Sequence, residues 1–334
     1  MPFLCAFQAA AHSVLSHGCI ITRRFIIAVA IWLEVSAIAT AQAPVFPQVE
    51  QSRQFTGPPA TVDLQGQRNA PQPENFDGAS TSDDAFGSQV IFKRQDKPQP
   101  FSAFAGIEAF VTNNVALAKV APQRDGFLEA TAGASFTQRF AYNLRFDASL
   151  VGAAYRYDRF PQLDFQSTEP SAAVTWSPPQ LHGAEVLLRY TFTDLTAAPR
   201  VREFYKSQAI LLGAQKVIPV SRSQVVYFGA SAQWSFAEPQ PDGRDEYVAY
   251  CGYKAQLTRR LSADLFYRYG RYVYRAGDGR QDNNHTISLG FRYSPTDWFS
   301  LSVNGYIAVD RSNQPAFDYD VGNAGLGLEF SFRF

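Results

Sequence analysis

From residue 101 to the end of the chain, large apolar side chains recur at every second position. The last ten residues show the pattern most plainly: Leu326, Leu328, Phe330, Phe332 and Phe334 alternate with small and charged residues. Successive side chains of a β-strand point to opposite faces, so this period of two predicts strands with one apolar face and one polar face. The alternation therefore indicates an all-β body.

Twelve segments of this kind follow one another, and no helical pattern interrupts them. They span 102–112, 127–137, 141–156, 168–177, 183–194, 203–217, 223–236, 245–257, 260–274, 283–294, 297–310 and 318–334. Long polar links follow the odd-numbered segments, and short turns follow the even-numbered ones. This alternation is typical of a barrel that crosses a bilayer. We therefore predict a transmembrane up-and-down antiparallel β-barrel of about 12 strands over residues 101–334.

Tryptophan placement favours the barrel over a soluble β-sandwich. Trp176 and Trp298 lie at strand ends on the side of the short turns, and Trp234 lies near the opposite edge. Amphipathic aromatic residues concentrate where hydrocarbon meets lipid headgroups, so we expect these three residues to be interface aromatics. A sandwich would give no reason for loops of alternating length.

The N-terminal region resembles an export signal followed by a spacer. Arg23 and Arg24 precede an apolar run at 25–39, and an A-x-A pattern predicts cleavage after Ala41. We interpret 1–41 as a signal peptide; the alternative is an uncleaved transmembrane anchor. Residues 42–100 are rich in Pro and Gln and have no periodicity, so they are predicted to be a disordered periplasmic segment.

Charge places further limits on the inside of the barrel. A charged side chain facing lipid at mid-membrane costs about 2–4 kcal/mol, so charges on the strands are expected to face the lumen. Glycines such as Gly229 and Gly252 are expected to leave room there for larger side chains. The predicted lumen-lining residues are Arg145, Asp147, Glu185, Arg189, Asp264, Arg268, Arg292, Glu329 and Arg333.

With these strands and the closing LGLEFSFRF, the region 101–334 resembles the bacterial outer-membrane β-barrel superfamily, in the loose class of porin-like barrels. The resemblance implies residence in the Gram-negative cell outer membrane, among its lipids, and the even strand count places both termini in the periplasm. It also implies that Phe330, Phe332 and Phe334 form the assembly signal read by the barrel assembly machinery. A weaker resemblance points to barrels of surface-polysaccharide export.

Several functions are compatible with this fold. A lumen carrying both signs of charge favours a porin-like channel for small polar solutes, or an accessory barrel of polysaccharide export. The same charges, paired across the interior, would instead give a structural barrel with an occluded lumen, because twelve strands enclose less space than open porins. An autotransporter translocator is disfavoured because 42–100 is short and polar and supplies no apolar-faced helix.

An outer-membrane lipid-modifying enzyme is the remote alternative. His285 has the parity of the lipid-facing residues, Ser288 has the opposite parity, and His182 lies in a short turn. A nucleophile needs a base within hydrogen-bond reach, and no such pair is evident, so we predict no enzyme activity and no catalytic residues. Cys251 is the only cysteine after the apolar run, and no cofactor or metal site is predicted. Lys and Arg equal Asp and Glu at 30 each, so a nucleic-acid partner is not expected.

Overall fold

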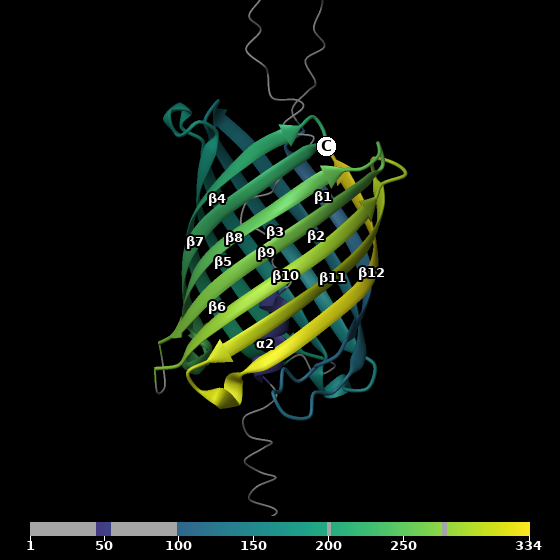
Figure 1. Ribbon diagram of the computed structural model, residues 1–334, viewed down its shortest axis with the longest axis vertical. Helices are drawn as coiled ribbons and strands as arrows, with labels where there is room; N and C mark the ends of the chain where they lie inside the picture. The colour runs from purple at the N-terminus through teal and green to yellow at the C-terminus, as the bar shows by residue number, and fades with distance from the viewer. Residues whose placement is uncertain (1–44, 55–98, 199–201, 276–278) are drawn as a thin grey trace, which may run out of the picture. The chain divides into compact units, whose positions relative to one another are not determined.

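The computed structural model describes residues 45–54, 99–198, 202–275 and 279–334. Twelve antiparallel strands form a closed barrel in which each strand pairs with its neighbours in sequence (Figure 1). This confirms the predicted fold class. The strands are β1 (Phe101–Thr112), β2 (Asp125–Ala141), β3 (Leu144–Tyr157), β4 (Phe165–Trp176), β5 (Ala184–Ala197), β6 (Arg202–Ser221), β7 (Gln224–Glu238), β8 (Arg244–Gln256), β9 (Leu261–Tyr274), β10 (Gln281–Tyr293), β11 (Phe299–Ser312) and β12 (Tyr319–Arg333).

The barrel closes where the last strand meets the first. The register between β1 and β12 runs from Ser102 opposite Arg333 to Thr112 opposite Asn323. Beyond β12, the backbone N–H of Phe334 donates to the carbonyl of Phe101 at 2.9 Å. The prediction that the final strand pairs with the first is thus confirmed, and the described sheet presents no unpaired edge.

Alternation along each strand separates the two faces of the barrel wall. On β5, Leu188 is 53% exposed and faces outward, whereas its neighbour Leu187 is 5% exposed and faces the interior. The outward residues of β12, from Leu326 to Phe332, are likewise exposed. These outward side chains are exposed among the described residues, and an apolar surface of this kind is suited to a lipid environment.

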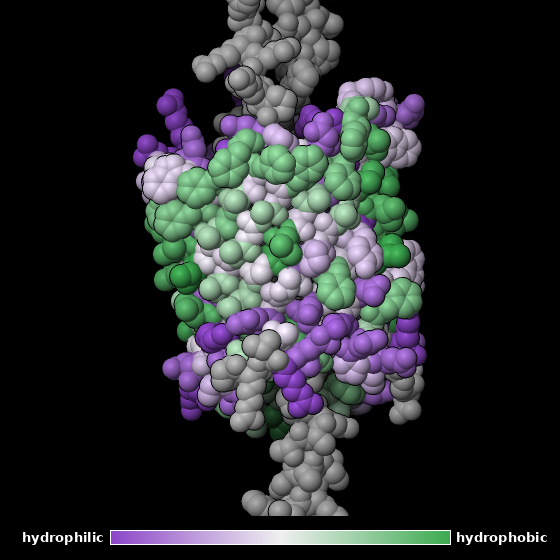
Figure 2. Space-filling model, turned by 180° about the vertical axis from the view of Figure 1, so that it is seen from behind, coloured by the Kyte–Doolittle hydropathy of each residue, from purple (hydrophilic) through white to green (hydrophobic). Residues whose placement is uncertain are grey.

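The connections define two ends of the barrel. The connections that follow the odd-numbered strands lie at what we call the loop end, and the described residues there are 113–124, 158–164, 198, 239–243, 275, 279–280 and 313–318. The connections that follow the even-numbered strands, 142–143, 177–183, 222–223, 257–260 and 294–298, lie at what we call the turn end. The predicted alternation of lengths holds along most of the chain, but 177–183 is as long as 158–164, and each of these two connections contains a 3-10 turn. On the face drawn in Figure 2, apolar residues cover much of the wall, and hydrophilic residues form a belt at the loop end.

One helix, α2 (Val45–Gln54), is also described. Its proline lies in the first turn, where a missing N–H is tolerated, and Arg53 in the last turn complements the helix dipole. This corrects the prediction of disorder for 42–100 in its first part, where polar composition concealed a short helix. The expected signal peptide 1–41 and residues 55–98 lie outside the described residues. Within the described part of the chain, no helix is long and apolar enough to span a membrane.

Candidate functional site

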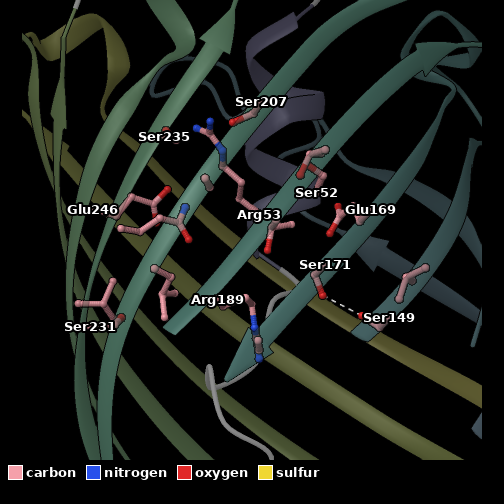
Figure 3. Close-up of a pocket in the computed structure, with 18 of the residues that line it drawn as sticks. Ser52, Arg53, Ser149, Glu169, Ser171, Arg189, Ser207, Ser231, Ser235 and Glu246 are labelled. Atoms are coloured by element: carbon pink, nitrogen blue, oxygen red, sulfur yellow. Dashed lines mark hydrogen bonds between the residues drawn. The ribbon is translucent and has the colours of Figure 1, made fainter. Parts of the chain in front are cut away.

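The interior of the barrel holds two polar cavities. The first, ≈ 370 Å³ in volume, is bordered by inward-facing residues of β3 to β9 and by Ser52 and Arg53 of α2 (Figure 3). The second, ≈ 450 Å³, is bordered mainly by β1, β2 and β8 to β11. Phe266 and Arg268 of β9 border both cavities and therefore lie between them.

Hydroxyl groups line much of the first cavity. Ser149 on β3 and Ser171 on β4 stand opposite each other, and their Oγ atoms are 2.8 Å apart (Figure 3). Further hydroxyls come from Thr191, Thr193, Ser207, Ser231 and Ser235. Hydroxyls both donate and accept hydrogen bonds, so this wall can exchange partners with water or with a polar solute.

Charged residues of both signs share the same wall. The cavity is bordered by Asp147, Glu169, Arg189, Glu246 and Arg268. Of the residues predicted to line the lumen, the structure thus brings Asp147, Arg189 and Arg268 to the first cavity, and Asp264, Arg268 and Arg292 to the second.

Arg145 and Asp147 form an ion pair along β3. The Arg145 Nε donates to Asp147 Oδ2 at 2.8 Å, and the hydroxyl of Thr137 on β2 donates to the other carboxylate oxygen at 2.8 Å. A second Arg145 nitrogen donates to Thr175 on β4. This ion pair joins two of the predicted lumen-lining residues and is linked by hydrogen bonds to both neighbouring strands.

Glu329 on β12 is bound by an arginine of another strand rather than by one on its own strand. Arg292 on β10 instead reaches across β11, where it donates to Ser300 at 2.9 Å, and it binds Glu329 on β12 at 3.0 Å. Arg333 lies exposed at the turn end, opposite Ser102. Ser300 on β11 stands directly opposite Glu329, and facing residues on adjacent strands are only about 4.5–5.5 Å apart, so the long side chain of Arg292 can reach both.

Asp264 also has a cross-strand partner. It accepts hydrogen bonds from the hydroxyl of Tyr227 on β7 at 3.2 and 3.3 Å. Arg268 lies 3.8 Å from Glu246 on β8 and donates to the Tyr272 hydroxyl. Glu185 accepts from Ser177 at the turn end at 3.4 Å.

Buried charges at the loop end were missed by sequence reasoning. Arg244, 1% exposed, donates to Glu246 at 2.8 Å and to the Tyr274 hydroxyl at 2.9 Å, and its guanidinium lies 3.9 Å from the centre of the Tyr272 ring. Arg244 and Glu246 have the same two-residue spacing as Arg145 and Asp147, but Arg244 lies just before the eighth predicted segment, which was expected to begin at residue 245.

Two side chains of α2 join this loop-end cluster. Glu50 Oε1 accepts a hydrogen bond from Arg244 Nη1 at 2.5 Å. Arg53 donates to the Tyr205 hydroxyl at 2.5 Å and to the backbone carbonyl of Asp242 at 3.1 Å. Residues of α2 from Val49 onward therefore occupy the loop end of the lumen.

Large aromatic residues also face the interior, where the sequence had indicated mainly charged and small residues. Tyr155 on β3 stacks on Phe165 of β4 with ring centres 4.2 Å apart. Near the turn end, Val225, Tyr227, Tyr250 and Phe266 form a buried apolar cluster. Part of the lumen is therefore packed rather than open.

The exterior aromatics lie where the strands end. Trp176 and Trp298 are 47% and 49% exposed at the turn end, and the Trp298 ring stacks on Phe330 at 6.0 Å. Trp234 lies opposite Asp245, beside the start of β8 at the loop end. Phe330, Phe332 and Phe334 all face outward.

His285 and Ser288 lie on opposite faces of β10. His285 is outside, where its Nδ1 is 2.9 Å from the Tyr267 hydroxyl and its ring lies beside Tyr269. Ser288 borders the second inner cavity. The barrel wall separates them, so they do not form a nucleophile and base pair. His182 is in the 177–183 turn.

A closed barrel with an apolar exterior and a polar lumen defines this chain as a β-barrel of the outer-membrane type. No family model matches its sequence, and a search of curated proteins finds no match.

Several solved structures resemble the barrel. An outer membrane channel from Pseudomonas putida F1 shares 10% identity over 73% of this chain and 100% of that chain, with a TM-score of 0.47. A bacterial polysaccharide outer membrane secretin shares 15% identity over 70% and 98%, with a TM-score of 0.41. The β domain of the Bordetella autotransporter BrkA shares 10% identity over 70% of this chain and 100% of that chain, with a TM-score of 0.41. Similarities this low carry no argument about what the protein does.

Proposed function

We propose that this protein is a porin-like channel of the Gram-negative outer membrane that admits small polar solutes. One observation carries the proposal: the lumen contains two cavities lined by hydroxyls and by charges of both signs. A barrel with a purely structural interior would be expected to fill that space with packed side chains. Cavities of ≈ 370 and ≈ 450 Å³ suit small solutes better than a polysaccharide chain.

In this proposal the turn end faces the periplasm, because short turns lie on that side in barrels of this type. Both ends of the barrel domain, Phe101 and Phe334, are then periplasmic. The outward stripe of Phe330, Phe332 and Phe334 would serve as the signal for the barrel assembly machinery.

An occluded accessory barrel is the second candidate, including an accessory role in polysaccharide export. The apolar cluster around Tyr227 and Phe266 and the helix residues at the loop end favour it, because both narrow the lumen.

Conductance measurements test the proposal. We expect the full mature chain in planar bilayers to conduct small ions, and Arg189→Gln, which removes a cation from the cavity wall, to shift selectivity away from anions. Arg275→Gln is the matched control, because that arginine pairs with Asp245 on the outer side of the barrel and should leave selectivity unchanged. If the wild type, Arg189→Gln and the variants of α2 proposed below all fail to conduct, the channel function is rejected in favour of the accessory barrel.

A further inference from the structure

The loop end of the lumen is occupied by a segment from the N-terminal side of the chain. Val49, Glu50, Gln51 and Ser52 of α2 are 1%, 3%, 1% and 9% exposed. Ser52 and Arg53 also border the first cavity (Figure 3). A helix so deeply buried inside a barrel lies in the path of any solute that enters from that end.

Charged side chains of this segment bind the barrel wall. Glu50 binds Arg244 at 2.5 Å, and Arg53 binds the Tyr205 hydroxyl and the Asp242 carbonyl. Arg53 and Glu50 also bind each other at 3.2 Å, so part of the charge is neutralised within the helix itself.

The barrel side of the main contact has other partners. Arg244 binds Glu246 and Tyr274, both on barrel strands, and its backbone N–H and carbonyl bond to Ser235. If α2 undocks, Arg244 still binds the Glu246 carboxylate and the Tyr274 hydroxyl, so its buried positive charge is not left unpaired.

Gln51 shows that the docked helix is not optimised for permanent packing. Its side chain is buried, and within the part of the chain that the structure describes neither its amide nitrogen nor its amide oxygen has a hydrogen-bond partner. A buried amide without partners opposes docking, because undocking would return both atoms to water. The docked state therefore combines a favourable ion pair, Glu50 with Arg244, with the free-energy cost of burying the Gln51 amide.

We propose that α2 is a releasable plug of this barrel, which closes the loop end when Glu50 binds Arg244 and opens it when the helix undocks. The proposal rests on the channel function proposed above and adds its regulation. It makes adjacent residues of α2 act in opposite directions on one equilibrium.

Two single variants in the full mature chain test this in planar bilayers. Glu50→Gln removes the charge that Arg244 binds and should raise the open fraction about tenfold or more, since a lost charge-assisted contact shifts such an equilibrium by at least that factor. Gln51→Met replaces the unsatisfied amide with an apolar side chain of similar shape and should lower the open fraction. Glu203→Gln changes an exposed glutamate that binds Lys206; it is the matched control and should leave the open fraction unchanged.

Heat-modifiable gel mobility verifies that each variant forms a folded barrel. If wild type and both variants conduct with the same open fraction, the plug is rejected while the channel stands. If Glu50→Gln and wild type are both silent although folded, the channel itself is rejected. Opposite shifts for Glu50→Gln and Gln51→Met support both proposals.

Discussion

At the scale of single residues, tyrosines and glycines fit together across β7 and β8. Tyr227 stands opposite Gly252, and Gly229 stands opposite Tyr250, so each ring lies over a residue without a side chain. A Cβ at Gly229 would lie 2.5 Å from the backbone oxygen of Ala214, as well as against the Tyr250 ring. Backbone cannot move aside as a flexible side chain can, so the glycine is required for the close approach.

We therefore expect Gly229→Ala to lower the free energy of unfolding by about 1–3 kcal/mol, the usual cost of overpacking. Urea unfolding in lipid vesicles, followed by heat-modifiable gel mobility, measures it. Gly152→Ala is the matched control, because its new Cβ would meet its nearest neighbour, the Ser167 oxygen, at an ordinary 3.8 Å. Equal stability of the two variants would contradict this account.

The sequence predicted room for larger side chains beside these glycines, and the structure shows which side chains use it. The inward aromatic residues were not predicted, because one aromatic residue among the polar, inward-facing positions of a single strand looks like a random exception to the pattern. It becomes meaningful only when the opposite strand supplies a glycine, and that pairing depends on the register.

At the scale of elements, one loop-end connection depends on a single carboxylate. Asp318 follows the 3-10 turn Pro315–Phe317, accepts a hydrogen bond from Lys119 at 2.6 Å, and accepts another from the backbone of Ser312 at 2.8 Å. The hydrogen bond from Lys119 is the main cause that lowers the pKa of Asp318, and the Ser312 N–H adds to it. The carboxylate thereby joins 113–124 to 313–318.

A carboxyl group with a lowered pKa stabilises the fold above its unfolded-state value of about 3.9, and this contribution disappears as the pH falls through the lower folded-state value. Hydrogen exchange of 113–124 and 313–318, corrected for intrinsic rates, should therefore accelerate between pH 4 and pH 2. Because Lys119 is half exposed, we expect less than about 1 kcal/mol. Asp318→Asn should abolish this step; an unchanged step in that variant would assign it to another group.

The closing strand β12 supplies a second element-scale prediction. Phe334 contributes backbone hydrogen bonds to Phe101 and an outward ring that is 65% exposed. If its ring is read during assembly, Phe334→Ala should reduce outer-membrane levels several-fold while the unfolding free energy of the assembled barrel changes little. Phe140→Ala removes a similarly exposed ring near the turn end and is the matched control. Equal membrane levels for the two variants would contradict the assembly role.

At the scale of the whole molecule, successive residues of each strand face opposite sides of the barrel wall, one toward the exterior and the next toward the lumen. Leu289 on β10 is 46% exposed on the outside, and its neighbour Ser288 stands opposite Phe266, which is buried in the interior. Leu289→Arg should destabilise the inserted barrel by up to about 2–4 kcal/mol, because it places a charge against hydrocarbon. Ser288→Arg should insert normally and reduce conductance. Unfolding in vesicles and bilayer recordings on the same two proteins measure both effects, and similar destabilisation by both would refute the assigned faces.

The sequence by itself determined the strands, their number, and the face on which nearly every outward residue lies. These properties follow from the period of two, which is local to each strand and needs no knowledge of its neighbours. Only the tertiary structure decided which charges meet, as when Arg292 binds Glu329 across β11, and where the helix of Glu50 and Arg53 lies. Such contacts join residues far apart in the chain, and their geometry is set by the stagger of strands that closure of the barrel imposes.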